Sequence, residues 1–329
     1  MCGFAGYAGE REYDTSVIRK MTDKIRHRGP DSQDAFVEGK VGLGFVRLSI
    51  IDLEGGSQPM FNEDKNLVLI FNGELYNFQD IRKELVEAGH VFTTHTDSEI
   101  LLHGYEEWGK EGLLGRLRGM FAFVIFDRTK KTLFGARDHF GIKPFYYYHK
   151  DGTFLFGSEI KSFLAHPDFQ KELFEEKLPD FMTFGCIPGA ETFFRNVYKL
   201  LPGHYFTYEE GRLTVSTYWE PTFDINENQT IESVADKLDG VLEDSVDKHI
   251  IADVPVCSFL SSGVDSSYVA YELKDKVDLT TFTIDFVEQK YSEAPHAKEL
   301  ADELGIRNIG RKVSADEYFH DAEKIQYYM

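Results

Sequence analysis

The second residue of the chain is a cysteine, and removal of Met1 would give it a free α-amino group beside its thiol. A thiol titrates at about 8.5 and an α-amine at about 8, so the amine can act as general base for its own nucleophile. Cys2 is therefore a candidate N-terminal nucleophile. A cysteine at this position could also be a coincidence, so the prediction depends on the residues that accompany it.

Cys2 begins the first of six segments rich in small and polar residues in the first two thirds of the chain. They lie at 2–6, 27–31, 47–51, 71–74, 96–99 and 136–144. In this order they resemble the class II glutamine amidotransferases, over residues 1–210. The resemblance implies a four-layer αββα sandwich of the N-terminal-nucleophile hydrolase type. It also implies that Cys2 hydrolyses glutamine and releases ammonia.

The same resemblance assigns a glutamine site to particular residues. Asn72 and the backbone N–H of Gly73 match the oxyanion hole, where one side-chain amide contributes about 3 to 4 kcal/mol to transition-state stabilisation. Arg47 matches the group that holds the α-carboxylate bidentately, and Asp97 matches the partner of the α-ammonium. The residues expected to line the same pocket are Leu48, Ser49, Ile50, Ile51 and Glu74.

Each of these residues, taken alone, also has an ordinary structural explanation. Asn72-Gly73 is a common hairpin turn sequence. Arg47 could be a solvated strand residue, and Asp97 could cap a helix with Glu99 in its first turn. The complete set favours the glutamine site over these separate explanations.

A second candidate site lies at 254–267, where an apolar run is followed by small residues and the start of a helix. Such a junction offers backbone N–H groups to an anion. It lacks the lysine of the G-x-x-x-x-G-K-[ST] loop, which argues against γ-phosphate chemistry. It is similar to the S-G-G-x-D-S loop of ATP pyrophosphatases, which attach AMP to a carboxylate. The resemblance implies bound ATP and Mg²⁺, with no metal ligand assigned, and an ATP site formed by Phe259, Ser261, Gly263, Asp265, Ser266 and Ile284.

Ser262 departs from this pattern, which has glycine at that position. If the position requires a positive φ, serine would be strained there. A serine-rich turn with a helix N-cap is the alternative explanation of the loop. Because this loop follows a predicted glutaminase, we favour a nucleotide-binding loop over that alternative.

Short strands joined by tight turns are expected to position the first site. Apolar runs flank turn sequences at 127–131, 150–152 and 209–211, as in β-hairpins. Apolar residues recur at helical spacing near 17–25, 81–86 and 100–105. These patterns predict antiparallel sheets covered by helices.

From residue 230 onward the pattern changes to alternating helices and strands. Helices are expected at 231–250, from 266 and at 292–304, and strands at 254–260, which should be buried, and 279–286. This order indicates a parallel, doubly wound sheet. The predicted fold class is α+β followed by α/β. The predicted domains are a glutaminase at 2–215, a polar linker at 216–229 and a partial ATP-pyrophosphatase-like domain at 230–329.

The composition excludes several classes of partner. There are 36 basic and 56 acidic side chains, for a net charge of −20, which disfavours nucleic acid and anionic membranes as partners. Three widely spaced cysteines are too few for a disulfide framework. The N-terminus has no basic region leading into an apolar stretch. These features indicate the cytoplasm.

Together the two parts resemble the glutamine-hydrolysing asparagine synthetases, which are ATP-dependent carbon–nitrogen ligases. The implied substrates are L-glutamine, L-aspartate and ATP. Ammonia would pass through an apolar tunnel to a β-aspartyl-AMP intermediate that is isolated from water. Further synthetase motifs of this family lie beyond residue 329, so we expect glutamine hydrolysis with little asparagine synthesis. A homodimer is the candidate assembly.

Two alternatives stay open at this stage. The same architecture could amidate another carboxylate, such as a cell-wall or natural-product precursor, or the chain could act as a glutaminase alone. A non-catalytic interaction module would predict broken catalytic positions, and Cys2, Arg47, Asn72, Gly73 and Asp97 are all intact.

Overall fold

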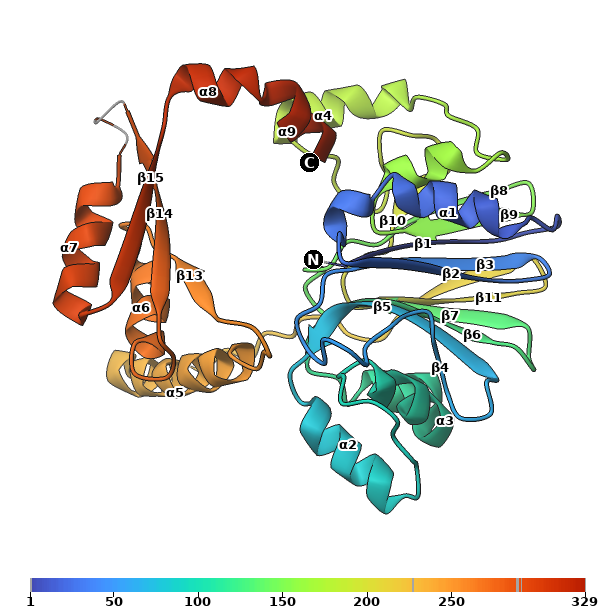
Figure 1. Cartoon of the computed structure of the whole chain (residues 1–329), viewed down its shortest axis with the longest axis horizontal. Helices are drawn as coiled ribbons and strands as arrows, with labels where there is room; N and C mark the ends of the chain where they lie inside the picture. Colours follow the sequence, from blue (N-terminus) through green and yellow to red (C-terminus); the bar gives the residue numbers. More distant parts are fainter. Residues whose placement is uncertain (1, 227, 288–289, 291, 329) are drawn as a thin grey trace. The chain divides into compact units, whose positions relative to one another are not determined.

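A computed structural model of the chain describes residues 2–226, 228–287, 290 and 292–328 (Figure 1). The chain divides into two compact units, Met1–Phe223 and Asp224–Met329. Met1, whose removal the predicted chemistry requires, lies outside the described residues.

The first unit contains two six-stranded antiparallel sheets. Across the first sheet the strands are β10 (Val197–Lys199), β8 (Tyr146–Lys150), β9 (Thr153–Gly157), β1 (Gly3–Ala8), β3 (Val41–Arg47) and β2 (Ser32–Glu38). Across the second they are β12 (Arg212–Thr217), β11 (His204–Glu209), β7 (Thr132–Arg137), β6 (Gly119–Asp127), β5 (Leu67–Leu75) and β4 (Met60–Phe61).

The two sheets pack face to face through a buried aromatic and aliphatic core. Phe4, Phe45 and Phe154 of the first sheet share one cluster with Val124 and Phe206 of the second. Side chains alternate between the two faces of a strand, so the same strands also have an outer face. In the first sheet this outer face is apolar as well, with Tyr7, Val46 and Leu155 in a second buried cluster.

Helices cover the outer faces of both sheets, which completes the predicted αββα order (Figure 1). On the first sheet, α1 (Thr15–Asp23) buries Ile18 and Met21 in an apolar cluster that also includes Phe163 of the short helix η2 (Ile160–Ala165). On the second sheet lie α2 (Phe78–Glu87) and α3 (Glu99–Leu114), and Tyr105 stacks on Phe134 of β7. The other short helices are η1 (Arg26–Arg28), η3 (Glu175–Lys177) and α4 (Leu178–Phe184).

The three predicted hairpins are present as β6–β7, β8–β9 and β11–β12. Their turns contain residues with positive φ, including Gly152 at +74° and Gly211 at +80°, where glycine avoids the steric cost of a side chain. The predicted linker began at 216, but β12 continues to Thr217. Tyr218 then donates a hydrogen bond to the Arg137 carbonyl at 2.9 Å. Residues 216–223 belong to the first unit.

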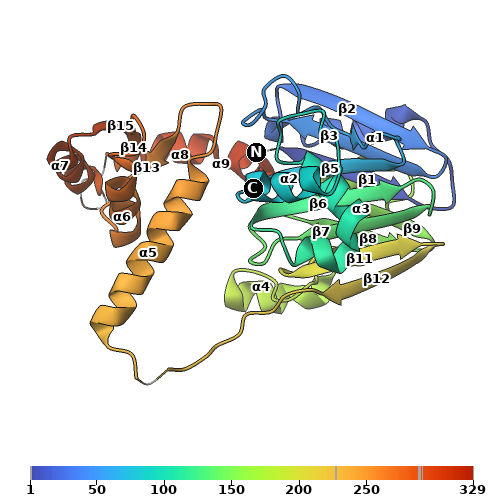
Figure 2. The same cartoon turned by 90° about the horizontal axis from the view of Figure 1, so that it is seen from below.

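The second unit alternates helices and strands as predicted, and its three strands are parallel in the order β13-β14-β15. Its elements are α5 (Ile231–His249), β13 (Cys257–Phe259), α6 (Val264–Leu273), β14 (Thr280–Phe286), α7 (Ala294–Leu304), β15 (Arg307–Val313), α8 (Ala315–His320) and α9 (Ala322–Tyr328). Figure 2 shows α5 along its length. A core cluster joins Val246 of α5, Leu273 of α6 and Ala301 of α7.

Two expectations for this unit were wrong or incomplete. The strand expected to be buried over 254–260 is a three-residue edge strand of the described sheet, and Phe259 is 78% exposed. β15 was not predicted, because its sequence Arg-Asn-Ile-Gly-Arg-Lys-Val is mostly polar and has no apolar run. Only its pairing with β14 identifies it as a strand.

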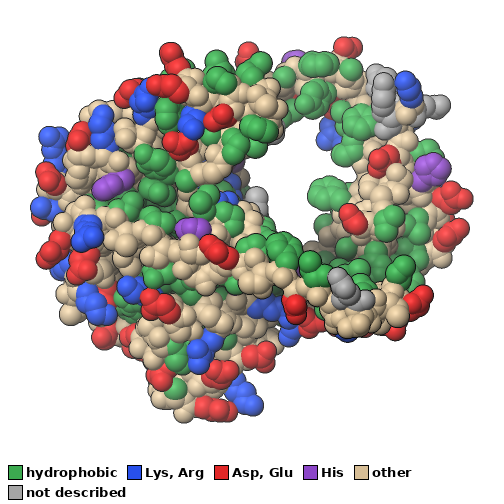
Figure 3. All heavy atoms as spheres, turned by 180° about the vertical axis from the view of Figure 1, so that it is seen from behind, with side chains coloured by type: hydrophobic (Ala, Val, Ile, Leu, Met, Phe, Trp, Pro, Cys, Tyr) green, Lys and Arg blue, Asp and Glu red, His purple; other side chains and the backbone are tan. Residues whose placement is uncertain are grey.

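Two global features bear on partners. Acidic and basic side chains are interspersed over the face of the first unit that Figure 3 shows. Within the described residues, each helix is too short or too polar to cross a bilayer.

Candidate active site

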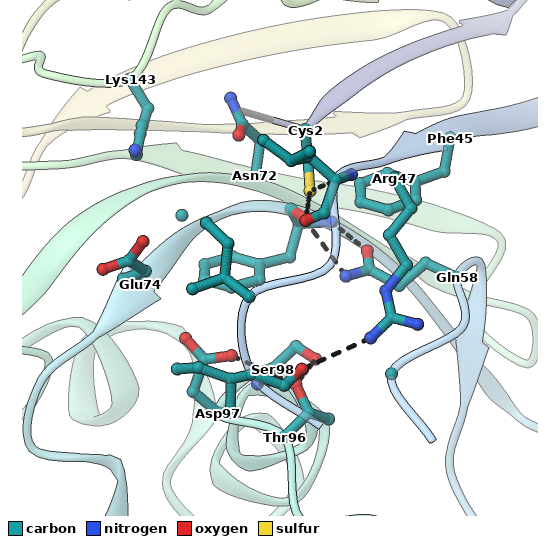
Figure 4. A pocket seen from close by; sticks show the side chains of 16 residues that line it. Cys2, Phe45, Arg47, Gln58, Asn72, Glu74, Thr96, Asp97, Ser98 and Lys143 are labelled. Atoms are coloured by element: carbon teal, nitrogen blue, oxygen red, sulfur yellow. Dashed lines mark hydrogen bonds between the residues drawn. The ribbon is translucent and has the colours of Figure 1, made fainter. Parts of the chain in front are cut away.

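One pocket of the first unit contains Cys2 and most of the residues predicted to bind glutamine (Figure 4). It is lined by Cys2, Phe45, Arg47, Leu48, Ile50, Ile51, Gly56, Gln58, Phe71, Asn72, Gly73, Glu74, Thr96, Asp97, Ser98 and Lys143. These residues come from the position directly before β1, the end of β3, the C-terminal half of β5 and the loops beside them.

Cys2 lies directly before β1, and its thiol is held by the backbone of Leu48. The Leu48 N–H donates to Sγ at 3.4 Å, and Sγ lies 3.4 Å from the Leu48 carbonyl oxygen. Burial raises the pKa of the thiol, while the Leu48 N–H and the charges of Arg47 and Lys143 oppose that shift. The thiol therefore needs a base before it can act as a nucleophile.

Asn72 and Gly73 lie inside β5, so the hairpin-turn alternative was wrong. The Phe71 N–H donates to Gln58 Oε1 at 2.6 Å, and the Leu75 N–H donates to Asp97 Oδ2 at 2.9 Å. Successive N–H groups of a strand alternate in direction, so the Gly73 N–H points to this same side, away from β6. A Cβ atom on Gly73 would lie 2.3 Å from the Met120 carbonyl oxygen, which explains why the position holds glycine.

The side chain of Asn72 supplies a second donor beside Cys2 (Figure 4). Asn72 is buried, and its Nδ2 makes no hydrogen bond to any described residue. A buried amide without a partner is costly in a folded protein and indicates a ligand or a catalytic role. With the Gly73 N–H, this amide can stabilise an oxyanion formed by attack of Cys2.

Arg47 ends β3 and is buried against a loop of the pocket wall. Its Nη1 donates to the Leu53 carbonyl at 3.1 Å, and its Nη2 donates to the Asp52 carbonyl at 2.6 Å. A Cβ atom on Gly56 would lie 2.4 Å from Nη2, so glycine at 56 leaves room for the guanidinium. These contacts hold the positively charged guanidinium of Arg47 in the pocket. Arg47 is buried, so the alternative that it is a solvated strand residue was wrong.

Asp97 is buried at the base of the segment that leads into α3. It accepts hydrogen bonds from the Leu75 N–H at 2.9 Å and from Thr96 Oγ1 at 3.2 Å. Burial raises its pKa to about 6, against the opposing effect of these hydrogen bonds. The N-cap position of α3 is occupied by Ser98, so the helix-cap alternative for Asp97 was wrong.

The structure differs from the sequence-based site at several positions. Ser49 does not line the pocket, because its N–H donates to Asp31 Oδ2 at 2.8 Å. Gln58 and Lys143 line the pocket and were not predicted. Gln58 braces β5 through both the N–H and the carbonyl of Phe71. Lys143 is buried, which lowers its pKa, while the charges of nearby Glu74 and Cys2 oppose the shift.

The second unit contains a hollow lined by four of the six residues predicted to bind ATP: Phe259, Ser261, Ser266 and Ile284. Gly263 and Asp265 lie at the N-cap and in the first turn of α6 and do not line it. Ser261 Oγ and Ser266 Oγ are 2.8 Å apart and hold the loop closed. The Ser262 N–H donates to Glu293 Oε2 at 3.2 Å.

Ser262 is not strained by its backbone conformation. Among the described non-glycine residues, positive φ angles occur at Asp52, Lys65, Lys131, Asp151, Asn196 and Glu210. The adjacent Gly263 has a φ of −77°. Serine is therefore compatible with this loop, and the strain considered from the sequence is absent at Ser262.

Two packed antiparallel sheets covered by helices, with Cys2 directly before a central strand, form the αββα sandwich predicted from the sequence. Residues 1–219 match the family model described as the glutamine amidotransferase domain, and the chain belongs to this family. Residues 237–329 match the family model described as asparagine synthase.

Several known proteins are similar to most of this chain. Asparagine synthetase [glutamine-hydrolyzing] 1 of Bacillus subtilis is 41% identical over 99% of this chain and 52% of its own length. Amidase chyE of Penicillium rubens is 33% identical over 93% of this chain and 50% of its own length. The solved glutamine phosphoribosylpyrophosphate amidotransferase of B. subtilis aligns with a TM-score of 0.48 and 18% identity, covering 94% of this chain and 65% of that chain. This chain spans about half the length of the curated relatives it matches.

Proposed function

We propose that the first unit hydrolyses L-glutamine to glutamate and ammonia, with Cys2 as the nucleophile. The observation that carries this proposal is the meeting of Cys2, Arg47, Asn72, Gly73 and Asp97 in one pocket. These residues come from four separate parts of the sequence, and each supplies a different group that glutamine hydrolysis needs.

The reaction follows from the positions of the donors around Cys2. After loss of Met1, the α-amine of Cys2 takes the thiol proton, and Sγ attacks the side-chain amide carbon of glutamine. Asn72 Nδ2 and the Gly73 N–H stabilise the oxyanion. The C–N bond then breaks, ammonia leaves with the transferred proton, and water hydrolyses the thioester to give glutamate and the free thiol.

Arg47 and Asp97 orient the other end of the substrate. The guanidinium of Arg47 pairs with the α-carboxylate, and the buried carboxylate of Asp97 pairs with the α-ammonium. Leu48, Ile50 and Ile51 line the same pocket. Ser49, which was predicted to join them, does not line the pocket, and its N–H donates to Asp31 Oδ2.

Glutamine binding is expected to weaken as the pH falls below about 6, because protonation of Asp97 removes the partner of the α-ammonium. The Cys2→Ala protein is expected to bind glutamine without hydrolysing it, so its Kd can be measured directly by calorimetry. We expect Kd to rise about tenfold per pH unit below the pKa of Asp97. In the same background, Asp97→Asn should bind at least about tenfold more weakly at pH 7.5 and lose this dependence. Parallel pH profiles for the two proteins would show that Asp97 is not the titrating group.

We propose that the second unit binds ATP at the loop 261–266 and forms an acyl-adenylate. The loop already donates the Ser262 N–H to an anionic oxygen, that of Glu293, which supports a role in binding phosphate oxygens. Phe259 and Ile284 give the hollow an apolar wall suited to a base. Asp265 and Glu293 supply carboxylates, the ligands that Mg²⁺ prefers, and Mg²⁺ would neutralise the phosphate charge.

For the whole protein we propose synthesis of asparagine from L-aspartate, with ammonia released at Cys2 as the nitrogen donor. The matching family models and the B. subtilis relative support this acceptor. A second candidate is amidation of another carboxylate, which the similarity to a protein named amidase chyE favours. A cytoplasmic location and a homodimer remain predictions.

Separate assays of the two half-reactions test this proposal. Glutamate release from glutamine alone measures the first unit, and its absence from protein that has lost Met1 would refute the glutaminase. AMP and pyrophosphate formation from ATP measures the second unit. AMP formation that depends on L-aspartate supports asparagine synthesis, whereas AMP formation with another carboxylate and not with aspartate supports the second candidate.

A further inference from the structure

A cluster of histidine and glutamate side chains lies outside the glutamine pocket, beside α3. Its members are Glu63 from the β4–β5 turn, His90 from the segment after α2, and His103 from α3. One potential ligand atom from each of these three residues lies within 4.8 Å of the other two. The cluster thus joins three segments that are separate in the sequence.

His103 is the buried centre of this cluster. It is 1% exposed, and neither ring nitrogen makes a hydrogen bond to any described residue. Carboxylates approach it without reaching hydrogen-bond geometry: Nδ1 lies 3.5 Å from Glu106 Oε2 and 3.7 Å from Glu63 Oε1. A buried imidazole surrounded by carboxylates at these distances leaves room for a cation between them.

The surrounding groups resemble the outer shell of a metal site. Glu99 faces Nε2 of His103 at 3.6 Å, and its carboxylate is held by the backbone N–H groups and hydroxyls of Thr93 and Thr94 at 2.6 to 2.9 Å. His90 Nε2 lies 3.2 Å from Glu107 Oε2. Carboxylates that hold the second nitrogen of a histidine orient the first toward a metal.

We propose that Glu63, His90 and His103 bind a divalent transition metal, with Zn²⁺ as the ion that this donor set favours. Two imidazoles and a carboxylate are common zinc ligands, with bonds of about 2.0 to 2.2 Å, so the three side chains must draw together on binding. Glu63 is half-exposed at a turn and has the freedom to move inward. Glu106 Oε2 lies 3.5 Å from Nδ1 of His103 but outside the three-residue cluster.

The competing occupant of this cluster is a proton. Burial alone would lower the pKa of His103, but the facing carboxylates of Glu106, Glu99 and Glu63 raise it to about 9. The same carboxylates attract either cation, and zinc must displace the proton from Nδ1. Metal binding therefore has to be measured directly, because either a proton on His103 or a bound zinc ion would stabilise the cluster.

Zinc titration of the full 329-residue chain tests the site. Cysteine thiols also bind zinc, so the titration is made in a background of Cys2→Ser, Cys186→Ser and Cys257→Ser after removal of metal by a chelator. With a competing chromogenic indicator, we expect one Zn²⁺ per chain. His90→Gln and Glu63→Gln should each weaken binding by about 10-fold to 100-fold or more, the range seen when groups supporting a metal are removed.

Both substituted residues are at least partly exposed, so the variants are expected to keep the fold. The matched control is the exposed pair His296 and Glu299 of α7, 3.9 Å apart, whose glutamine variants should bind zinc as the parent does. Co²⁺ in place of Zn²⁺ adds a visible spectrum that reports nitrogen and oxygen ligands. The proposal is overturned if the metal-free protein binds no stoichiometric zinc, or if both His90→Gln and Glu63→Gln bind it as tightly as the parent.

Discussion

Replacing Cys2 by alanine is expected to lower kcat for glutamine hydrolysis at least about 1000-fold. The covalent route depends on one sulfur atom, and no other described side chain of the pocket is a thiol or is placed to replace it. Glutamate release at saturating glutamine measures the effect. Glutamine binding should persist, because Arg47 and Asp97 are unchanged, so the loss should appear in kcat and not in Kd.

Cys186→Ala is the matched control for this variant. Cys186 is exposed and lies outside the residues that line the pocket, so its substitution should leave the rate unchanged. A glutamine-mimicking electrophile gives an independent test, because it should alkylate Cys2 and spare Cys186 and Cys257. Mass mapping that finds Cys2 unmodified, or Met1 still attached to active protein, would contradict the proposed chemistry.

Much of the first unit was predictable from sequence because its signals are local. Each hairpin combines apolar runs with a turn sequence, and the pairs β6–β7, β8–β9 and β11–β12 formed where both signals agreed. The covering helices were predictable for a similar reason, since apolar residues spaced along one face mark a helix that packs on a sheet. Ile25 was expected to continue the first of these helices, but α1 ends at Asp23. A tighter turn after α1 places Ile25 in the same apolar cluster as Ile18 and Met21.

Other features depend on long-range contacts that no local pattern carries. Asn72-Gly73 has a strong turn signal, yet pairing with β6 keeps both residues in an extended strand. Gln58 lies in a loop 13 residues before Phe71, and Lys143 lies in a loop much later in the sequence. Both reach the pocket only because the packed sheets bring these loops together. β15 has polar composition and becomes a strand only through β14.

The second strong prediction concerns the oxyanion hole. Asn72→Ala is expected to lower kcat for glutamine hydrolysis by about 100-fold to 1000-fold, the usual effect of removing one oxyanion donor. KM should change by only a few fold, because the amide is proposed to contact the oxyanion and not the ground-state carboxylate or ammonium. Initial rates of glutamate release over a range of glutamine concentrations separate the two parameters.

Thermal unfolding of the same variant distinguishes a catalytic amide from a structural one. Asn72 Nδ2 has no hydrogen-bond partner among the described residues, so truncation breaks no hydrogen bond at that nitrogen and should cost little stability. A structural asparagine would instead lose stability together with activity. A Tm several degrees lower, with kcat reduced only in proportion to the unfolded fraction, would therefore contradict the oxyanion role.

The activity that remains in Asn72→Ala should be greater than that of Cys2→Ala, because one donor and the nucleophile are still in place. The Gly73 N–H continues to face the pocket between the groups bound by Gln58 and Asp97. It cannot be tested by substitution in the same way, since a Cβ atom at this position would collide with the Met120 carbonyl oxygen and shift β5 itself. Because both variants keep the Gly73 N–H, the ratio of their residual rates compares the loss of the nucleophile with the loss of the Asn72 amide.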